Sequence, residues 1–330
     1  MMRFCDEAVK KGSMGDGKEK KRVMVGCVCA FLGEVLFGLS YMFTKKATES
    51  VSAFELLGWR FFAAFLIMNI CVILGIVKLN HEDGDLKKGL SKDRRESLLK
   101  LIPIAVFSPV IYFIGETVGI SHTSSCESGI FLASIPVISM ACSTLILNKR
   151  PSKFQIIGIV ITFIGVSITV IAAGLSASFS AVGYLFLTIA VIAYALYGVY
   201  VEKATGYTDA EITYVMLAFG AVVFTTIAII KALIAGNLVY LLTLPFNNTS
   251  LLIAVLYQSI GCSILAFLLA NTAIANIGVN RAYSFLGIST IVSILAGALV
   301  LGESVTPMQL VGAAVIVAGI YIANVVKARN

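Results

Sequence analysis

Apolar runs of roughly 20 residues follow one another along this chain, and they leave it very few possible folds. About 20 apolar residues in a helix cross the ~30 Å hydrocarbon core of a membrane, and a backbone in lipid must satisfy its own hydrogen bonds. The 330 residues are 58% hydrophobic and 13% charged, whereas soluble domains are about a quarter charged. We therefore predict an all-α integral membrane protein with ten transmembrane helices, at 24–43, 54–77, 99–120, 127–147, 154–173, 181–201, 211–235, 250–275, 282–301 and 307–326.

Lys and Arg residues gather in the connections on one side of these spans. Cytoplasmic loops carry such an excess, so we predict the cell (plasma) membrane with both termini cytoplasmic. The first 22 residues are too polar and too long for a signal peptide and are predicted to be a disordered cytoplasmic tail. Most connections are short; 78–98 is long and highly charged, and 236–249 is expected to be polar and uncharged. The basic residues on the cytoplasmic side include Lys10, Lys11, Lys18, Lys20, Lys21, Arg22, Lys78, Lys87, Lys88, Lys149, Arg150, Lys153, Lys203, Arg281, Lys327 and Arg329.

One sequence pattern, Q-x-x-G-x6-G, occurs twice in the chain, and it divides the spans into two sets. Its matching residues are Gln155, Gly158 and Gly165 in the first copy and Gln309, Gly312 and Gly319 in the second. We predict two five-helix repeats, at 24–173 and 181–326. Because five is odd, the second copy enters the membrane from the opposite side, so the repeats are inverted. Inverted repeats are typical of transporters, with a substrate site near the midplane between the halves.

Three stretches carry a family resemblance. They are LFGLSYMFTKKA (36–47) with WRF (59–61), SSCESGIFLASIP (124–136), and LGESVTPMQLVGAAVIVAG (301–319). In these the chain resembles the EamA-type ten-helix members of the drug/metabolite transporter (DMT) superfamily. The resemblance covers 24–326 and implies transport of amino acids, sugars, drugs, nucleobases or other metabolites.

The two repeats depart from each other at two positions of that family pattern. The Glu before the last helix is Glu303 in the second repeat but Lys149 in the first, and the Pro of the fourth helix is Pro136 in the first but Thr290 in the second. We therefore do not expect the halves to move symmetrically.

Ionisable residues within the spans are candidates for the transport site, because each costs about 2.5–3.5 kcal/mol at the centre of a helix. Glu34 lies in the middle of the first span with no basic residue nearby in that span. We predict that it lines the pathway, where it either couples transport to protons or holds a cationic group of the substrate. Glu116 and Glu127 are predicted to line the pathway as well. Arg60 is a further candidate, or it pairs with Glu55 or Glu116 to let the helices assemble.

Aromatic and polar residues complete the candidate site. They can line a cavity for a flat or amphipathic solute, although packing and interface anchoring remain the alternative for each aromatic residue. The first, third, fourth, sixth, eighth and ninth spans are predicted to line the cavity. The fifth and tenth spans are predicted to lie outside it, because their glycines favour close helix packing as scaffold or dimer-facing helices. The residues of this class are Tyr41, Trp59, Tyr112, Tyr194, Tyr197 and Gln258.

These features predict a secondary active transporter, an exporter of small organic metabolites such as amino acids that works by alternating access. Its expected partners are the small-molecule substrate, the lipid bilayer, protons and a second copy of the chain. We expect no nucleic acid, and neither cofactor nor metal, because His81 and His122 have no Cys/His cluster beside them. A membrane sensor or structural protein without transport is the alternative. An intramembrane enzyme is a third reading, but the spans show no nucleophile–base pair.

Overall fold

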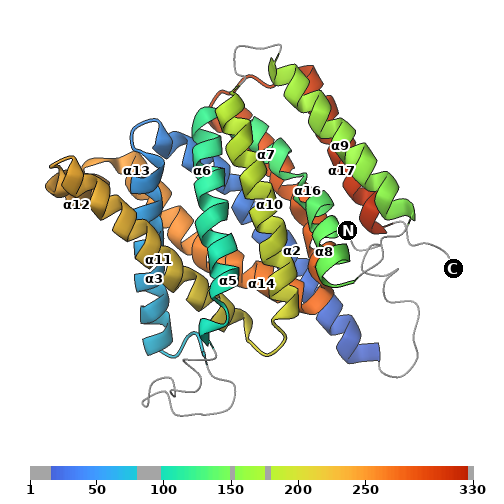
Figure 1. The fold of residues 1–330 in the computed structure, drawn as a ribbon, viewed down its shortest axis with the longest axis horizontal. Coiled ribbons are helices and arrows are strands. Elements are labelled where there is room, and N and C mark those ends of the chain that lie inside the picture. Colours follow the sequence, from blue (N-terminus) through green and yellow to red (C-terminus); the bar gives the residue numbers. More distant parts are fainter. Residues whose placement is uncertain (1–15, 80–97, 149–152, 175–179, 326–330) are drawn as a thin grey trace.

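Long helices form a single bundle in the computed structural model, which describes residues 16–79, 98–148, 153–174 and 180–325. Figure 1 shows α9 and α17 paired at one edge of this bundle and α12 at the opposite edge. Every regular element within the described ranges is a helix. The all-α fold predicted from hydropathy is confirmed.

Among the described residues, the two halves have the same order of elements, apart from α12 of the second half; residues 80–97, at the corresponding place in the first half, lie outside the described ranges. Each has two long helices, a third helix widened by π-helical turns, a fourth that is interrupted near its start, and a fifth. The first half is α2 (Asp16–Thr48), α3 (Ala53–Ile73), α5 (Ile102–Ala105), η1 (Val106–Ile111), α6 (Tyr112–His122), α7 (Ser125–Leu132), α8 (Ile135–Ile146) and α9 (Lys153–Gly174). The second half is α10 (Ala181–Lys203), α11 (Asp209–Ile234), α12 (Leu238–Asn247), α13 (Thr249–Leu256), η2 (Tyr257–Ala266), α14 (Phe267–Ile277), α15 (Val279–Ala282), η3 (Tyr283–Phe285), α16 (Leu286–Val300) and α17 (Pro307–Val325).

Within the described ranges, eight helical stretches are long and apolar enough to cross a membrane, so the chain is an integral membrane protein. Eight of the ten predicted spans are thereby confirmed. The fifth and tenth correspond to α9 and α17, whose described apolar stretches are shorter, at Ile156–Gly165 and Pro307–Gly319; their crossing stays a prediction. The eight stretches are Glu19–Thr48, Ala53–Ile73, Ile102–His122, Glu127–Ile146, Ala181–Lys203, Asp209–Ile234, Thr249–Ile277 and Val279–Val300.

The predicted cytoplasmic segments are only partly described. α2 begins at Asp16, so residues 16–22 of the predicted tail are helical. Residues 1–15, most of the 78–98 loop and Lys149 lie outside the described residues.

Equivalent helices of the two halves pack in equivalent ways. α2 packs on α14 and α16 of the second half, and α10 packs on α6 and α8 of the first. The remaining long helices pair with their own counterparts, α3 with α11 and α9 with α17. The interface between the halves therefore runs through the middle of the bundle.

The glycines of the repeated pattern lie where α9 crosses α17. A Cβ added at Gly165 would lie 2.9 Å from the carbonyl oxygen of Gly312, and one at Gly319 would lie 2.8 Å from that of Gly158. Backbones approach this closely in lipid only where the residues are small. The first glycine of each helix meets the second glycine of the other, so the helices are antiparallel, as an inverted repeat requires. The predicted packing role of these glycines is confirmed.

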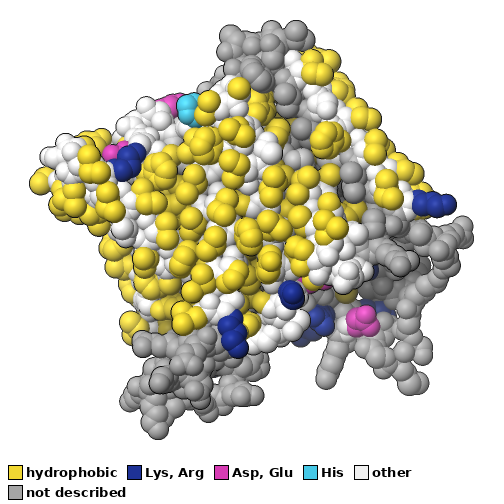
Figure 2. All heavy atoms as spheres, in the orientation of Figure 1, with side chains coloured by type: hydrophobic (Ala, Val, Ile, Leu, Met, Phe, Trp, Pro, Cys, Tyr) yellow, Lys and Arg dark blue, Asp and Glu magenta, His cyan; other side chains and the backbone are white. Residues whose placement is uncertain are grey.

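The prediction of a polar connection at 236–249 is wrong, because this stretch forms the apolar helix α12. Only its ends are polar in the sequence, and its interior reads LVYLLTLPF. Leu241 and Leu244 are buried against the bundle, whereas Val239 and Phe246 are 74% and 77% exposed. Ten residues are too few to cross a membrane. The exposed side chains continue the apolar surface that covers the face drawn in Figure 2.

The loops at the two ends of α11 allow a test of orientation. Gly206 lies before this helix and Asn237 after it, both are exposed, and the 26 helical residues separate the loops by about 39 Å. In a cysteine-free background, we expect Asn237→Cys to react with a membrane-impermeant maleimide on intact cells. Gly206→Cys should react only after permeabilisation. The reverse pattern would contradict the prediction of cytoplasmic termini.

Candidate functional site

Three ionisable side chains are buried near the middle of the bundle. Glu34 of α2, Arg60 of α3 and Glu116 of α6 are 5%, 0% and 1% exposed. All three belong to the first half of the chain, and the second half surrounds them with neutral polar groups. Ionisable residues at membrane depth are costly and usually mark a functional pathway.

Glu116 is held by Tyr112, which precedes it by one helical turn. The Tyr112 hydroxyl donates to Oε1 of Glu116 at 2.9 Å. The other carboxyl oxygen, Oε2, is buried and has no hydrogen-bond partner among the described residues. Arg60 acts electrostatically on Glu116, but it gives its own hydrogen bonds to residues of the second half. One acceptor oxygen of Glu116 is therefore left for another group.

Tyrosine rings from both halves form a wall beside these residues. The ring of Tyr112 packs on that of Tyr194, with centroids 4.6 Å apart, and Tyr194 packs on Tyr197 and Tyr283 at 5.1 and 5.3 Å. The hydroxyls are anchored: Tyr197 donates to Oδ1 of Asn271 at 2.5 Å, and Tyr283 donates to the carbonyl oxygen of Tyr194 at 2.9 Å. The wall is therefore rigid and joins α6, α10 and η3.

Glu34 faces the second half across a very small cavity. Tyr194, Tyr283 and small residues of α14 line this cavity, in which about 10 Å³ is open to the centre of a water molecule; that is room for about one water. The Ser289 hydroxyl lies within hydrogen-bonding range of the carboxyl group. Oε2 of Glu34 has no partner in the described part of the chain. Tyr41, two turns further along α2, is near enough to both Glu34 and Glu116 to interact electrostatically with each of them.

Arg60 is held by the widened turns of η2. Its Nε donates to Oγ of Ser263 at 2.9 Å, and its Nη1 donates to Oε1 of Gln258 at 3.2 Å. The ring of Phe113 covers the guanidinium, 4.1 Å from its Cζ. Glu55 does not pair with Arg60, because its carboxylate accepts from the backbone of Ser52 at 2.7 Å and caps α3. Segments of π-helix are rare and are frequent at functional sites.

Most residues predicted for the site lie together in this central cluster. Among the described residues, His, Cys, Asp and Glu side chains form no group of three that could hold a metal ion. The predicted residues in the cluster are Glu34, Tyr41, Arg60, Tyr112, Glu116, Tyr194, Tyr197 and Gln258.

Glu127 and Trp59, also predicted for the site, lie outside the cluster. Glu127 forms the capping box of α7 with Ser124, and its Oε1 accepts from Nε2 of Gln309 at 3.0 Å. Trp59 is half-buried, and its Nε1 donates to the carbonyl oxygen of Leu241 in α12 at 3.0 Å. Both side chains therefore join helices to one another.

Three polar residues of the cluster were not predicted, namely Thr213, Tyr283 and Ser289. Thr213 accepts from Nδ2 of Asn271 at 2.9 Å. Tyr283 lies at the start of a predicted span, where a tyrosine usually marks the membrane interface, so only the tertiary packing shows that it faces inward. Short hydroxyl side chains such as Ser289 gave no signal, because they are common in helices that cross membranes.

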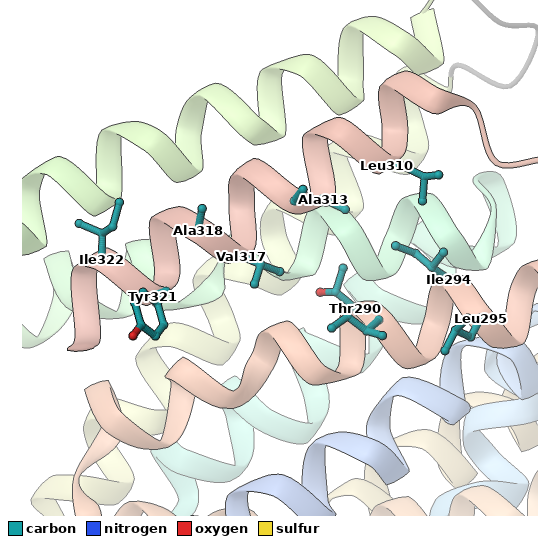
Figure 3. A pocket seen from close by; sticks show the side chains of 11 residues that line it. Thr290, Ile294, Leu295, Leu310, Ala313, Val317, Ala318, Tyr321 and Ile322 are labelled. Atoms are coloured by element: carbon teal, nitrogen blue, oxygen red, sulfur yellow. The ribbon is translucent and has the colours of Figure 1, made fainter. Parts of the chain in front are cut away.

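A larger groove lies between α16 and α17, away from the cluster. Its volume is about 790 Å³, and Figure 3 shows side chains of the two helices facing each other across it. The lining is apolar apart from Thr290 and Tyr321, and the Thr290 hydroxyl donates to the carbonyl oxygen of Gly129 at 3.2 Å. A polar solute would find few partners here, whereas the central cluster offers buried polar and charged groups.

Comparison with known proteins matches almost the whole chain. Residues 24–171 and 181–325 each match the model described as the EamA-like transporter family, which agrees with the two predicted repeats. The uncharacterized transporter YcxC of Bacillus subtilis (strain 168) is 29% identical over 300 residues, which are 90% of this chain and 92% of that protein. The uncharacterized transporter YyaM of the same organism is 24% identical over 302 residues, 89% of this chain and 92% of that protein.

A solved crystal structure supports the fold. It superposes with a TM-score of 0.59 at 15% identity and covers 94% of this chain and 99% of that one. At this identity the similarity concerns the arrangement of the helices alone.

Proposed function

Since the chain belongs to the EamA-like transporter family and is a membrane transporter, we propose that it works by secondary active transport. It exports small organic metabolites such as amino acids across the cell (plasma) membrane by alternating access. The substrate site in this proposal is the central cluster around Glu34, Arg60 and Glu116.

One observation carries this proposal: the buried polar cluster lies at the interface of the two halves. The first half contributes the charged groups and Tyr112 of the tyrosine wall. The second half contributes Tyr194, Tyr197 and Tyr283 of that wall and the amides of Gln258 and Asn271. Transporters with inverted repeats bind their substrates at such an interface. A structural membrane protein would gain little from three buried ionisable groups at this cost.

The equivalent packing of the halves supplies a route between two access states. α2 contacts α14 and α16, while α10 contacts α6 and α8. Opening one set of contacts while the other closes would turn access from one side of the membrane to the other. The cavity beside Glu34 holds about one water and is too small for an amino acid, so the helices must separate at that point before a substrate can bind there.

Glu34 is the proton-coupling residue in this proposal. A carboxyl group prefers its neutral form where it is desolvated and its charged form where water reaches it. Each cycle of opening and closing changes the hydration of Glu34, so it takes up a proton in one state and releases it in another. Tyr41 and Ser289 lie beside it and remain neutral hydroxyls near neutral pH.

Substrate exchange in proteoliposomes tests the proposed function. Liposomes that contain the purified protein and an excess of unlabelled amino acid should accumulate the same amino acid in labelled form from outside. Protein-free liposomes should not do so. A folded protein that binds metabolites in a thermal-shift screen but moves none of them would contradict transport and favour a sensor.

A further inference from the structure

Arg60 is the buried cation of the central cluster, and the proposed function gives its charge no role. Its side chain is completely buried, and a guanidinium stays protonated in proteins. Nε and Nη1 donate to the neutral oxygens of Ser263 and Gln258. Nη2 is buried, and no acceptor for it occurs within the described ranges.

An unpaired buried cation is expensive, because desolvation costs several kcal/mol that only an opposite charge offsets fully. The acid that acts electrostatically on Arg60 is Glu116, but Tyr112 already donates to one of its oxygens. The other acids of this region point elsewhere, since Glu55 caps α3 and Glu34 faces α14 and Ser289. Among the described residues, the neighbours of Arg60 therefore leave Nη2 without an acceptor and the guanidinium without a hydrogen-bonded counter-ion.

We propose that Arg60 binds the carboxylate of the transported metabolite, with Nη2 as the free donor. This inference rests on the proposed function and names the charged group that its substrate must carry. A hydrogen bond from a guanidinium N–H to a carboxylate is charge-assisted and roughly twice as strong as one between neutral groups. Ser263 and Gln258 hold the guanidinium in one orientation in advance, and Phe113 shields one of its faces.

The contacts of Gln258 give this proposal a sharp test. Its Oε1 lies 3.2 Å from Nη1 of Arg60, and its Nε2 donates to Oγ1 of Thr44 at 2.9 Å. Gln258→Glu keeps the shape and places a permanent anion beside the guanidinium. The hydroxyl of Thr44 can turn to donate to the new carboxylate. The carboxylate introduced at position 258 would neutralise the Arg60 guanidinium inside the protein. This should stabilise the ligand-free protein and prevent the substrate carboxylate from pairing with Arg60.

Asn271→Asp is the matched control. Asn271 is also a completely buried amide of the same helical span, but it bonds to Tyr197 and Thr213. Neither of these two partners is a cation, so the same change from amide to carboxylate there should lower the melting temperature. The sign of the shift thus separates a specific partner of Arg60 from a general effect of added charge.

Binding is measured on the purified full-length protein with matched pairs of probes. The pairs are L-alanine with L-alaninamide, L-phenylalanine with L-phenylalaninamide, and L-lactate with L-lactamide. We expect the carboxylates to raise the wild-type melting temperature, because a ligand of the native state stabilises it. The amides should have little effect. Stabilisation by lactate as well as by amino acids would identify the carboxylate alone as the recognised group, whereas a response to amino acids only would add a requirement for the ammonium group.

The variants then decide the role of Arg60. Arg60→Lys keeps the charge but loses the planar fork, and we expect carboxylate binding to weaken about tenfold. Gln258→Glu should melt at a higher temperature than the wild type and no longer respond to carboxylates. Equal stabilisation by acids and amides, or an undiminished carboxylate response in Gln258→Glu, would overturn the proposal. Carboxylate binding without any flux would leave this site standing and instead contradict the proposed transport.

Discussion

Glu34→Gln is expected to let substrate exchange across a proteoliposome membrane but to abolish its accumulation in response to a pH gradient. A gradient of one pH unit supplies about 1.4 kcal/mol per proton, which corresponds to roughly tenfold accumulation at equilibrium. The wild type should approach that ratio if one proton is coupled, whereas the variant should stay near equal concentrations. The fold should be retained, since the amide has a similar shape and removes a charge from a site that is only 5% exposed.

Glu49→Gln is a suitable control for this measurement. Glu49 is exposed and pairs with Lys46 at 3.1 Å on the surface, so its neutralisation should leave the accumulation ratio unchanged. If Glu34 instead holds a cationic group of the substrate, Glu34→Gln should bind substrate more weakly at every pH. Wild-type accumulation by Glu34→Gln would remove Glu34 from the mechanism, and Glu116 would become the acid to test.

Gly319→Leu should cause most of the purified protein to aggregate or to melt at a much lower temperature. A Cβ at Gly319 would lie 2.6 Å from the backbone nitrogen of Thr162 and 2.8 Å from the carbonyl oxygen of Gly158. Overpacking costs about 1–3 kcal/mol where neighbouring side chains can adjust. Here the neighbours are the Thr162 side chain and two backbone atoms, and the backbone atoms move only if α9 moves. Size-exclusion profiles and thermal unfolding in detergent measure the effect.

Gly206→Leu provides the control, because a Cβ at Gly206 meets nothing within 4 Å. Its melting temperature should match that of the wild type. A well-folded Gly319→Leu protein with altered substrate selectivity would show that α9 and α17 border the transport pathway. It would also reverse our assignment of these two helices to packing.

The sequence predicted the spans well because lipid leaves the backbone few alternatives. Runs of apolar residues must form helices there. The repeated glycines indicated that the fifth and tenth spans pack closely on other helices, and the structure shows that they pack on each other. α12 was missed because the polar residues at both its ends suggested a loop. Its apolar interior is too short to register as a span, and only packing against α3 and α11 shows its place.

The sequence predicted which residues belong to the candidate site better than it predicted which residues they contact. The free energy needed to place an ionisable side chain within a membrane span is enough to single out Glu34, Arg60 and Glu116 as candidate site residues. The partners of Arg60 lie about 200 positions away in the chain, and no local pattern encodes such a distance. Glu127 was predicted for the site by the same free-energy argument. However, Ser124 three residues earlier matches the S-x-x-E capping signal, so a helix cap accounts for Glu127 at this position.

The uneven division of charge between the halves has an electrical consequence. Glu34, Arg60 and Glu116 all belong to the first half, while the second half contributes neutral groups to the cluster. A membrane voltage does work only on charge that moves, about 2.3 kcal/mol per elementary charge per 100 mV. If the halves rock against each other, the protein's own charges that move through the membrane field are those on α2, α3 and α6. The voltage dependence of turnover should therefore follow the protonation of the acids on these three helices and the charge of the bound solute.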